Sequence, residues 1–155
     1  MSTVEVGKKV PDFELPATSE TTVSPKSLKG RKVVIYFYPK DSTPGCTTEG
    51  QDFRDAIADF EDQSAAVLGA SRDGLKAQEN FKAKHEFPFD LVSDKDERLC
   101  NLFDVIKLKN MYGRQVRGIE RSTFLIDADG VLHEEWRKVK VAGHAGDVLE
   151  AVKAL

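Results

Sequence analysis

The chain has 155 residues, of which 40% are hydrophobic and 32% charged, a balance typical of a globular domain with its own core. Its net charge of -3 provides no basic surface of the kind that nucleic acids bind. No apolar stretch is long enough for a signal peptide or a membrane span. We therefore expect a single cytoplasmic domain over residues 1–155, with no nucleic-acid partner and no membrane partner.

The first part of the chain predicts strands. Residues 13–16 and 21–24 have the pattern of a small N-terminal hairpin. Residues 32–38 are a run of β-branched and aromatic side chains between a glycine and a proline, which predicts a central strand buried on both faces. A second buried strand is expected over residues 65–71, and a polar helix follows over residues 75–84.

The segment between the two buried strands has helical periodicity. Phe53, Ile57 and Phe60 recur at spacings of four and three, which places them on one face of a single helix. Thr43 is suited to the N-cap, and Pro44 to the first helical position, where its missing N–H is tolerated. Residue 46, a cysteine, then lies in the first turn, where the helix dipole and unpaired backbone N–H groups favour a thiolate.

The last third of the chain predicts a short helix over residues 94–103 and a hairpin of strands 122–126 and 131–136, followed by a closing amphipathic helix. The basic stretch 106–117 is interpreted as a solvated loop. Strands that alternate with helices and end in an antiparallel pair predict an α/β fold with helices on both faces of a sheet.

The three histidines do not have the spacing of a metal site. His85, His133 and His144 lie far apart, and none belongs to an HExxH or Cys-x-x-Cys pattern. We expect surface or capping roles for them and no bound metal.

Residues 39–46 read Pro-Lys-Asp-Ser-Thr-Pro-Gly-Cys, and the pattern Pro-x-x-x-Thr-x-x-Cys after a buried strand resembles the peroxidatic-cysteine motif of the peroxiredoxins. The match extends to the peroxiredoxin Q subgroup, also called bacterioferritin comigratory protein, and similar stretches cover essentially the whole chain. The residues that carry this closer match are Gly45, Thr47, Thr48, Glu49, Gly50 and the segments 10–13, 69–73, 89–94 and 118–124.

The resemblance implies a thioredoxin-like fold, with a central mixed sheet flanked by helices and an N-terminal β-hairpin extension. It implies a monomer without a cofactor, in which a Cys46 thiolate reduces hydrogen peroxide or an organic hydroperoxide and becomes a sulfenic acid. The implied peroxide pocket is built from Pro39, Thr43 and Arg121 around Cys46. Thr43 would orient the peroxide, Pro39 would exclude water and Arg121 would stabilise charge, while Glu49 would orient neighbouring groups.

The second cysteine decides how such a sulfenic acid is reduced. Many members of the subgroup have a cysteine five residues after the first, or on the helix that here covers residues 75–84, but this chain has Gln51 and a helix without cysteine. Cys100 is expected to be a small buried hydrophobe. We therefore expect a one-cysteine cycle completed by an external thiol, such as thioredoxin, glutaredoxin or glutathione. The alternatives are an atypical two-cysteine cycle through Cys100 and a peroxide sensor without efficient turnover.

A dithiol oxidoreductase is a competing function on the same fold. It needs the pattern Cys-x-x-Cys at the start of the helix, where this chain has Glu49. The sequence therefore excludes it.

Overall fold

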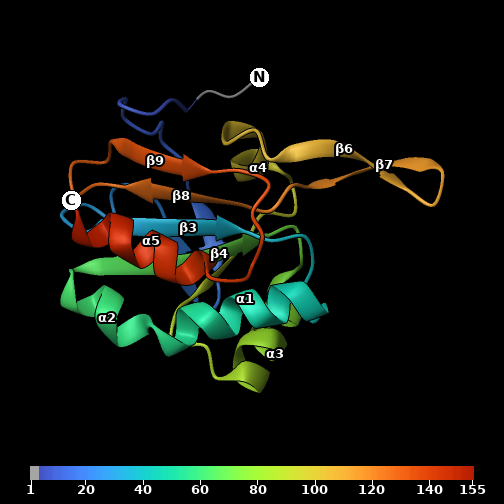
Figure 1. The fold of residues 1–155 in the computed structure, drawn as a ribbon, viewed down its shortest axis with the longest axis horizontal. Helices are drawn as coiled ribbons and strands as arrows, with labels where there is room; N and C mark the ends of the chain where they lie inside the picture. The colour runs from blue at the N-terminus through green and yellow to red at the C-terminus, as the bar shows by residue number, and fades with distance from the viewer. Residues whose placement is uncertain (1–3) are drawn as a thin grey trace.

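A computed structural model describes residues 4–155, and a seven-stranded mixed sheet forms its centre (Figure 1). In spatial order the strands are β2 (Thr21–Val23), β1 (Leu15–Ala17), β5 (Leu91–Ser93), β4 (Ala65–Ser71), β3 (Lys32–Phe37), β8 (Ser122–Ile126) and β9 (Leu132–Trp136). Strand β3 pairs in parallel with β4 and antiparallel with β8. The N-terminal hairpin, predicted from the sequence, joins this sheet through β5.

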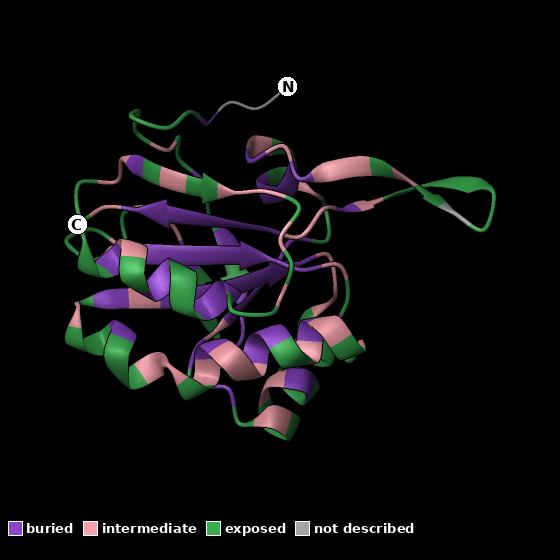
Figure 2. Ribbon diagram, viewed as in Figure 1, coloured by how far each residue is buried: buried purple, intermediate pink, exposed green. Residues whose placement is uncertain are grey.

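Strand β3 is buried along nearly its whole length (Figure 2). Its side chains alternate between two hydrophobic cores, one on each face of the sheet. Tyr36 points into a core that it shares with helices on one face of the sheet, whereas Phe37 points into the core on the other face. The helices are α1 (Pro44–Asp55), α2 (Ile57–Asp62), α3 (Leu75–His85), α4 (Arg98–Leu102) and α5 (His144–Lys153).

Helices cover both faces of the sheet, as predicted, but unequally. The core around Tyr36 receives Phe53 from α1, Phe81 from α3 and residues of α2 and α5. The opposite core receives Leu99 from the short helix α4, together with N-terminal residues. No helix within residues 4–155 has the length and apolarity that crossing a membrane requires.

The single helix predicted through Phe53 and Phe60 is divided in the structure. Helix α1 ends at Asp55 and α2 begins at Ile57, because Ala56 leaves the helical region with φ -100° and ψ 4°. Phe53 and Phe60 still enter the same core. The apolar stripe was therefore predicted correctly, whereas the continuous helix was wrong.

Residues 106–117 do not form the solvated loop that their charge suggested. They belong to a two-stranded antiparallel hairpin of β6 (Ile106–Met111) and β7 (Arg114–Ile119), which projects from the body of the molecule (Figure 1). The connection has positive φ at Tyr112 (54°) and Gly113 (77°), as a two-residue type I′ turn requires. We call residues 106–119 the β6–β7 arm.

Candidate active site

Cys46 lies where the central strand passes into α1. Thr43 is the N-cap residue, and its carbonyl accepts the first helical hydrogen bond from the Thr47 N–H at 2.9 Å. Pro44 is the first residue of the helix, as predicted. The Cys46 side chain therefore sits in the first turn, only 1% exposed, where the helix N-terminus favours negative charge.

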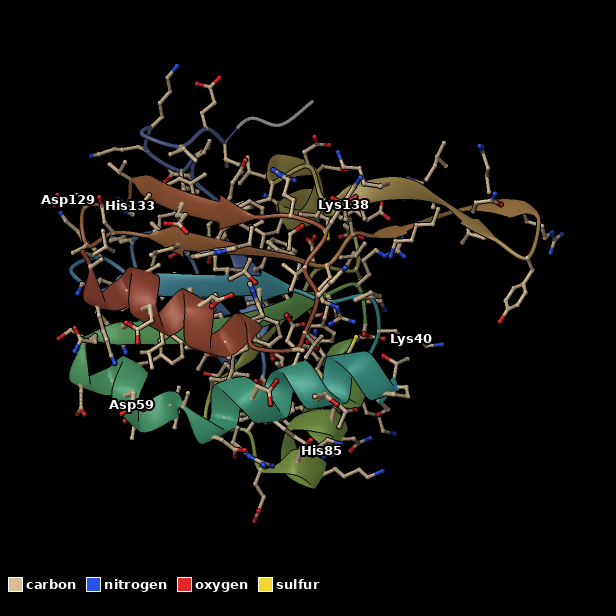
Figure 3. The ribbon with its side chains drawn as sticks, viewed as in Figure 1. Lys40, Asp59, His85, Asp129, His133 and Lys138 are labelled. Atoms are coloured by element: carbon tan, nitrogen blue, oxygen red, sulfur yellow. The ribbon has the colours of Figure 1, made fainter. Side chains whose placement is uncertain are left out.

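Thr43 occupies the N-cap position, as predicted, but its side chain makes no capping hydrogen bond. Its hydroxyl donates instead to the carbonyl of Lys40 at 2.7 Å, within the loop that precedes α1. The Lys40 side chain extends outward beside the start of α1 (Figure 3). Pro39 is half-buried between this loop and β3. Pro39 and Thr43 thus lie in the loop that leads from β3 into the first turn of α1.

Arg121 brings a positive charge to Cys46 from the link between β7 and β8. Its Nη2 donates to Cys46 Sγ at 3.4 Å, and its Nη1 donates to Glu49 Oε1 at 2.6 Å. Cys46 and Glu49 are three residues apart on α1, so they share one face of the helix. One guanidinium therefore bridges a thiol and a carboxylate that are both almost completely buried.

Gly45 makes this approach possible. A Cβ atom at Gly45 would lie 3.1 Å from Nη2 of Arg121, which is closer than most side chains tolerate. The absence of a side chain at this position lets the guanidinium lie against the first turn of α1.

Glu49 has an unusual environment for a carboxyl group. Burial raises its pKa to about 7, even though Arg121 acts in the opposite direction. Its Oε2 atom has no hydrogen-bond partner among residues 4–155, and neither has the buried hydroxyl of Tyr36. Because Glu49 exchanges a proton near neutral pH, the share of the Arg121 charge that acts on Cys46 increases when Glu49 is neutral.

His144 is buried, so the expectation of a surface or capping role was wrong for this histidine. Its Nε2 lies 2.7 Å from Thr123 Oγ1, and its ring contacts Phe53 and Trp136 edge-on. Burial lowers its pKa, and the nearby Arg121 charge lowers it further, although Asp147 opposes them. This histidine therefore packs against Phe53 of the core around Tyr36, where burial disfavours its protonated form.

The other two histidines lie apart from each other and from the thiol. His133 is exposed on β9, and His85 lies at the end of α3, on the opposite side of the molecule (Figure 3). Within residues 4–155 no three His, Cys, Asp or Glu side chains are grouped so that they could hold a metal ion.

Cys100 is fully buried on α4, as predicted, but in the core on the opposite face of the sheet from Cys46. Burial raises the pKa of its thiol well above the ordinary range, and the Asp94 carboxylate adds to this effect. The Asp94 side chain also accepts the backbone N–H of Cys100 at 2.7 Å. The structure therefore separates the two cysteines by the sheet itself.

Lys109 is a second cation near the thiol, which the sequence analysis did not identify. Its ammonium donates to the carbonyl of Ile119 at the base of the arm. Burial lowers the Lys109 pKa, Arg121 lowers it further, and Glu120 and Cys46 act in the opposite direction. The strict alternation of lysine and apolar residues over 106–109 was the available signal.

Comparison with known proteins shows the family to which the chain belongs. The family model described as the AhpC/TSA family matches residues 6–135. The chain belongs to the AhpC/TSA family of peroxiredoxins. As a peroxiredoxin it is a thiol-dependent peroxidase with a thioredoxin-like fold.

The similarity to individual peroxiredoxins extends over nearly the whole chain. Peroxiredoxin Bcp of Xanthomonas campestris pv. campestris is 57% identical over 143 residues, which cover 92% of this chain and 89% of the relative. Peroxiredoxin Bcp of Bacillus subtilis strain 168 is 48% identical over 151 residues, 97% of this chain and 96% of the relative. The solved structure of Xanthomonas campestris peroxiredoxin Q has a TM-score of 0.90 at 54% identity, covering 99% of this chain and 97% of that one.

Proposed function

We propose that this peroxiredoxin reduces hydrogen peroxide and organic hydroperoxides through a sulfenic acid on Cys46, and that an external thiol then restores the cysteine. The observation that carries the proposal is the Arg121 guanidinium, which donates to Cys46 Sγ at 3.4 Å in the first turn of α1. A fixed cation and a helix N-terminus both stabilise negative charge at this sulfur.

The proposed reaction is a displacement at oxygen. The Cys46 thiolate attacks the terminal oxygen of the hydroperoxide, an S–O bond forms, and the O–O bond breaks. The leaving oxygen departs as an alkoxide or hydroxide and takes a proton from solvent, so water or an alcohol is released. Negative charge moves from sulfur to the leaving oxygen, and Arg121 N–H groups stabilise it there.

Thr43 and Pro39 have supporting roles in this proposal. The Thr43 hydroxyl, which donates to the Lys40 carbonyl in this structure, would turn to the bound peroxide and orient it. Pro39 would keep water from the reacting oxygen. Glu49 would position Arg121 through the contact of 2.6 Å between them, without taking part in proton transfer.

A solved relative supports organic hydroperoxides as substrates. The bacterioferritin comigratory protein of Xanthomonas campestris, described with alkyl peroxide reduction activity, has a TM-score of 0.90 to this chain at 52% identity, covering 99% of this chain and 98% of that one. The two chains share the fold that places the thiol, so we extend the same substrate class to this protein.

The two cores support the one-cysteine cycle. Cys100 lies on α4 in the core opposite to that of Cys46, so an internal disulfide would require α4 to leave the sheet. The chain has no third cysteine. A sulfenic acid on Cys46 would therefore wait for thioredoxin, glutaredoxin or glutathione.

Intact-mass analysis after one equivalent of peroxide tests the proposed cycle. Wild type and Cys100→Ser should both gain one oxygen atom and form the same amount of dimedone adduct, while Cys46→Ser should form none. A rapid loss of two hydrogen masses in wild type alone would show a disulfide and refute the one-cysteine cycle. Steady-state peroxide consumption with a thiol donor separates this enzyme from a peroxide sensor, which would not turn over.

A further inference from the structure

None of the residues proposed to act on the peroxide lies in the β6–β7 arm, yet the arm stands beside the candidate active site. It projects from the body at the same end of the molecule as the start of α1 (Figure 1), and most of its residues are exposed (Figure 2). The apolar side chains of Leu108 and Val116 are 68% and 43% exposed, and Tyr112 at the turn is 99% exposed. Leu108 and Val116 lie on opposite faces of the hairpin, because Leu108 is paired with Arg117 and Val116 with Lys109.

The arm differs in charge from the rest of the molecule. Residues 106–119 include four cations and no carboxylate, whereas the remaining residues contain 19 Lys and Arg against 26 Asp and Glu. Lys107 is paired with Asp104, and Arg117 is paired with Glu97. Glu97 also pairs with Arg72, so one carboxylate is shared by two guanidinium groups. Positive charge therefore remains in excess along the arm and at its base.

One face of the arm looks toward Cys46. Lys109 lies directly opposite Val116 in the hairpin, and Arg114 lies two residues before Val116 on the same strand. These three residues therefore share one face. Lys109 on this face is bonded to the Ile119 carbonyl, close enough to Cys46 and Arg121 for their charges to act on it. We call the surface of Lys109, Arg114 and Val116 the Lys109 face. It extends from Arg114 beside the turn to Lys109, whose ammonium reaches the base of the arm.

We propose that the Lys109 face is the docking surface for an acidic dithiol reductant protein, which it positions over oxidised Cys46. This inference rests on the one-cysteine cycle proposed above, because that cycle requires an external thiol. The face combines the cations Lys109 and Arg114 with the part-exposed side chain of Val116, and its positive charge suits a carboxylate-rich protein surface. Six residue pairs give the arm a length of about 20 Å, far more than a small thiol can contact.

Docking serves the reduction of the Cys46 sulfenic acid, which passes through a mixed disulfide. A thiolate of the reductant attacks the sulfur of the Cys46 sulfenic acid, an S–S bond forms, and the S–O bond breaks with release of water after protonation. The second thiol of the reductant then attacks the reductant's sulfur atom in this mixed disulfide. Cys46 leaves as the thiolate, and the reductant carries away the disulfide.

A charge reversal on the arm tests the proposal. Arg114→Glu should lower kcat/KM for thioredoxin, used as the acidic dithiol protein, by roughly tenfold, and the loss should shrink as salt is added. Turnover supported by dithiothreitol, a small uncharged dithiol, should change less than about twofold. The rate of the Cys46 reaction with peroxide should also stay unchanged, because Arg114 is exposed at the far end of the arm.

Lys29→Glu is the matched control. It changes the net charge by the same amount, and Lys29 is exposed in the segment that precedes β3, whereas Cys46 follows the other end of that strand. An equal loss in both variants would refute the proposal, since only total charge would then matter. An equal loss with dithiothreitol and thioredoxin would also refute it, because the arm would then act on the thiol itself. Arm-dependent binding to vesicles of anionic lipid, or to a second copy of this chain, without an effect on thioredoxin would assign the arm to that other partner.

A second measurement separates docking from peroxidase activity. In the Cys100→Ser protein, Cys46 is converted to its mixed disulfide with thionitrobenzoate. The release of the coloured thiolate by thioredoxin is then compared between this protein and the same protein with the additional substitution Arg114→Glu. A slower release from the Arg114→Glu protein supports docking even where peroxide turnover fails. Identical release rates would refute it.

Discussion

Arg121 divides one guanidinium between Cys46 and Glu49, and each contact affects the other. The Nη1 atom holds the Glu49 carboxylate at 2.6 Å, which fixes the plane of the guanidinium and aims Nη2 at the sulfur 3.4 Å away. A planar group with two parallel donors can do this, whereas a lysine ammonium would serve one partner at a time. The arginine therefore combines charge with orientation at the sulfur.

Replacement of Arg121 by methionine should lower the second-order rate constant with hydrogen peroxide by about 10²–10³, the loss typical of removing a donor that stabilises developing charge. Stopped-flow measurement of the peroxide reaction checks the rate. The double variant with Glu49→Gln removes the carboxyl that would be left without its cation. If the double variant recovered the wild-type rate, Arg121 would act only by neutralising Glu49.

Gly45→Ala should separate activity from stability. The added Cβ would lie 3.1 Å from Arg121 Nη2, so the guanidinium must move away from the sulfur, and we expect a several-fold slower peroxide reaction. Alanine in place of glycine within a helix stabilises it by roughly 0.5–1 kcal/mol, so thermal stability should not fall. Gly146→Ala in α5 is the control, because its Cβ meets nothing within 4 Å. Equal rates in both variants would show that Gly45 does not constrain Arg121.

Among the structural elements, the loop between β3 and α1 precedes the first turn that carries Cys46, and the buried Asp41 with the half-buried Asp73 anchors this loop. The Tyr38 hydroxyl donates to Asp41 Oδ1 at 2.6 Å, and the Asp41 N–H donates to Asp73 Oδ2 at 2.9 Å. Ser71 at the end of β4 donates to the same Asp73 oxygen. Burial raises the Asp41 pKa to about 6, while the Tyr38 bond opposes this and Asp73 adds to it.

Asp41→Asn should make the protein more stable at neutral pH. The pKa of Asp41 is raised on folding, so its proton binds more tightly to the folded state, and stability falls as pH rises from about 4 through 6. Asparagine keeps the acceptor for Tyr38 and removes the charge, so we expect a gain of roughly 1 kcal/mol at pH 8 and almost none at pH 4. Urea unfolding across this range measures both values. An unchanged pH slope would show that Asp41 does not ionise in this interval, since Glu49 titrates separately near pH 7.

The sequence predicted the elements with strong periodicity and missed those set by tertiary contacts. The buried strand β3 and the position of Cys46 followed from local pattern and helix capping. The break at Ala56 did not, because Phe53 and Phe60 keep a helical spacing on both sides of it. Residues 106–117 were predicted to be a loop because of their charge, although lysine and apolar residues alternate over 106–109 as in a strand. Arg121 meets Cys46 across 75 residues, a contact that only the family resemblance suggested.

In the molecule as a whole, the sheet separates two cysteines that lie in different environments. One face carries α1 with Cys46, Glu49 and the aromatic core around Tyr36. The other face carries α4 with Cys100, which lies among apolar side chains and beside the Asp94 carboxylate. Because β3 sends alternate residues to the two cores, the same strand packs against the core that contains Cys46 and against the core that encloses Cys100.

This partition predicts that oxidation and alkylation will distinguish the two thiols. Treatment of the folded protein with excess peroxide should oxidise Cys46 alone, and N-ethylmaleimide should label Cys46 at least about 10² times faster than Cys100. Burial and Asp94 raise the pKa of Cys100, so its thiolate is scarce as well as inaccessible. Peptide mapping by mass spectrometry measures both reactions, and labelling in denaturant should make the two rates similar. Oxidised Cys100 in the folded protein would mean that α4 opens on the timescale of catalysis, and the sheet would then no longer isolate the second cysteine from the peroxide cycle.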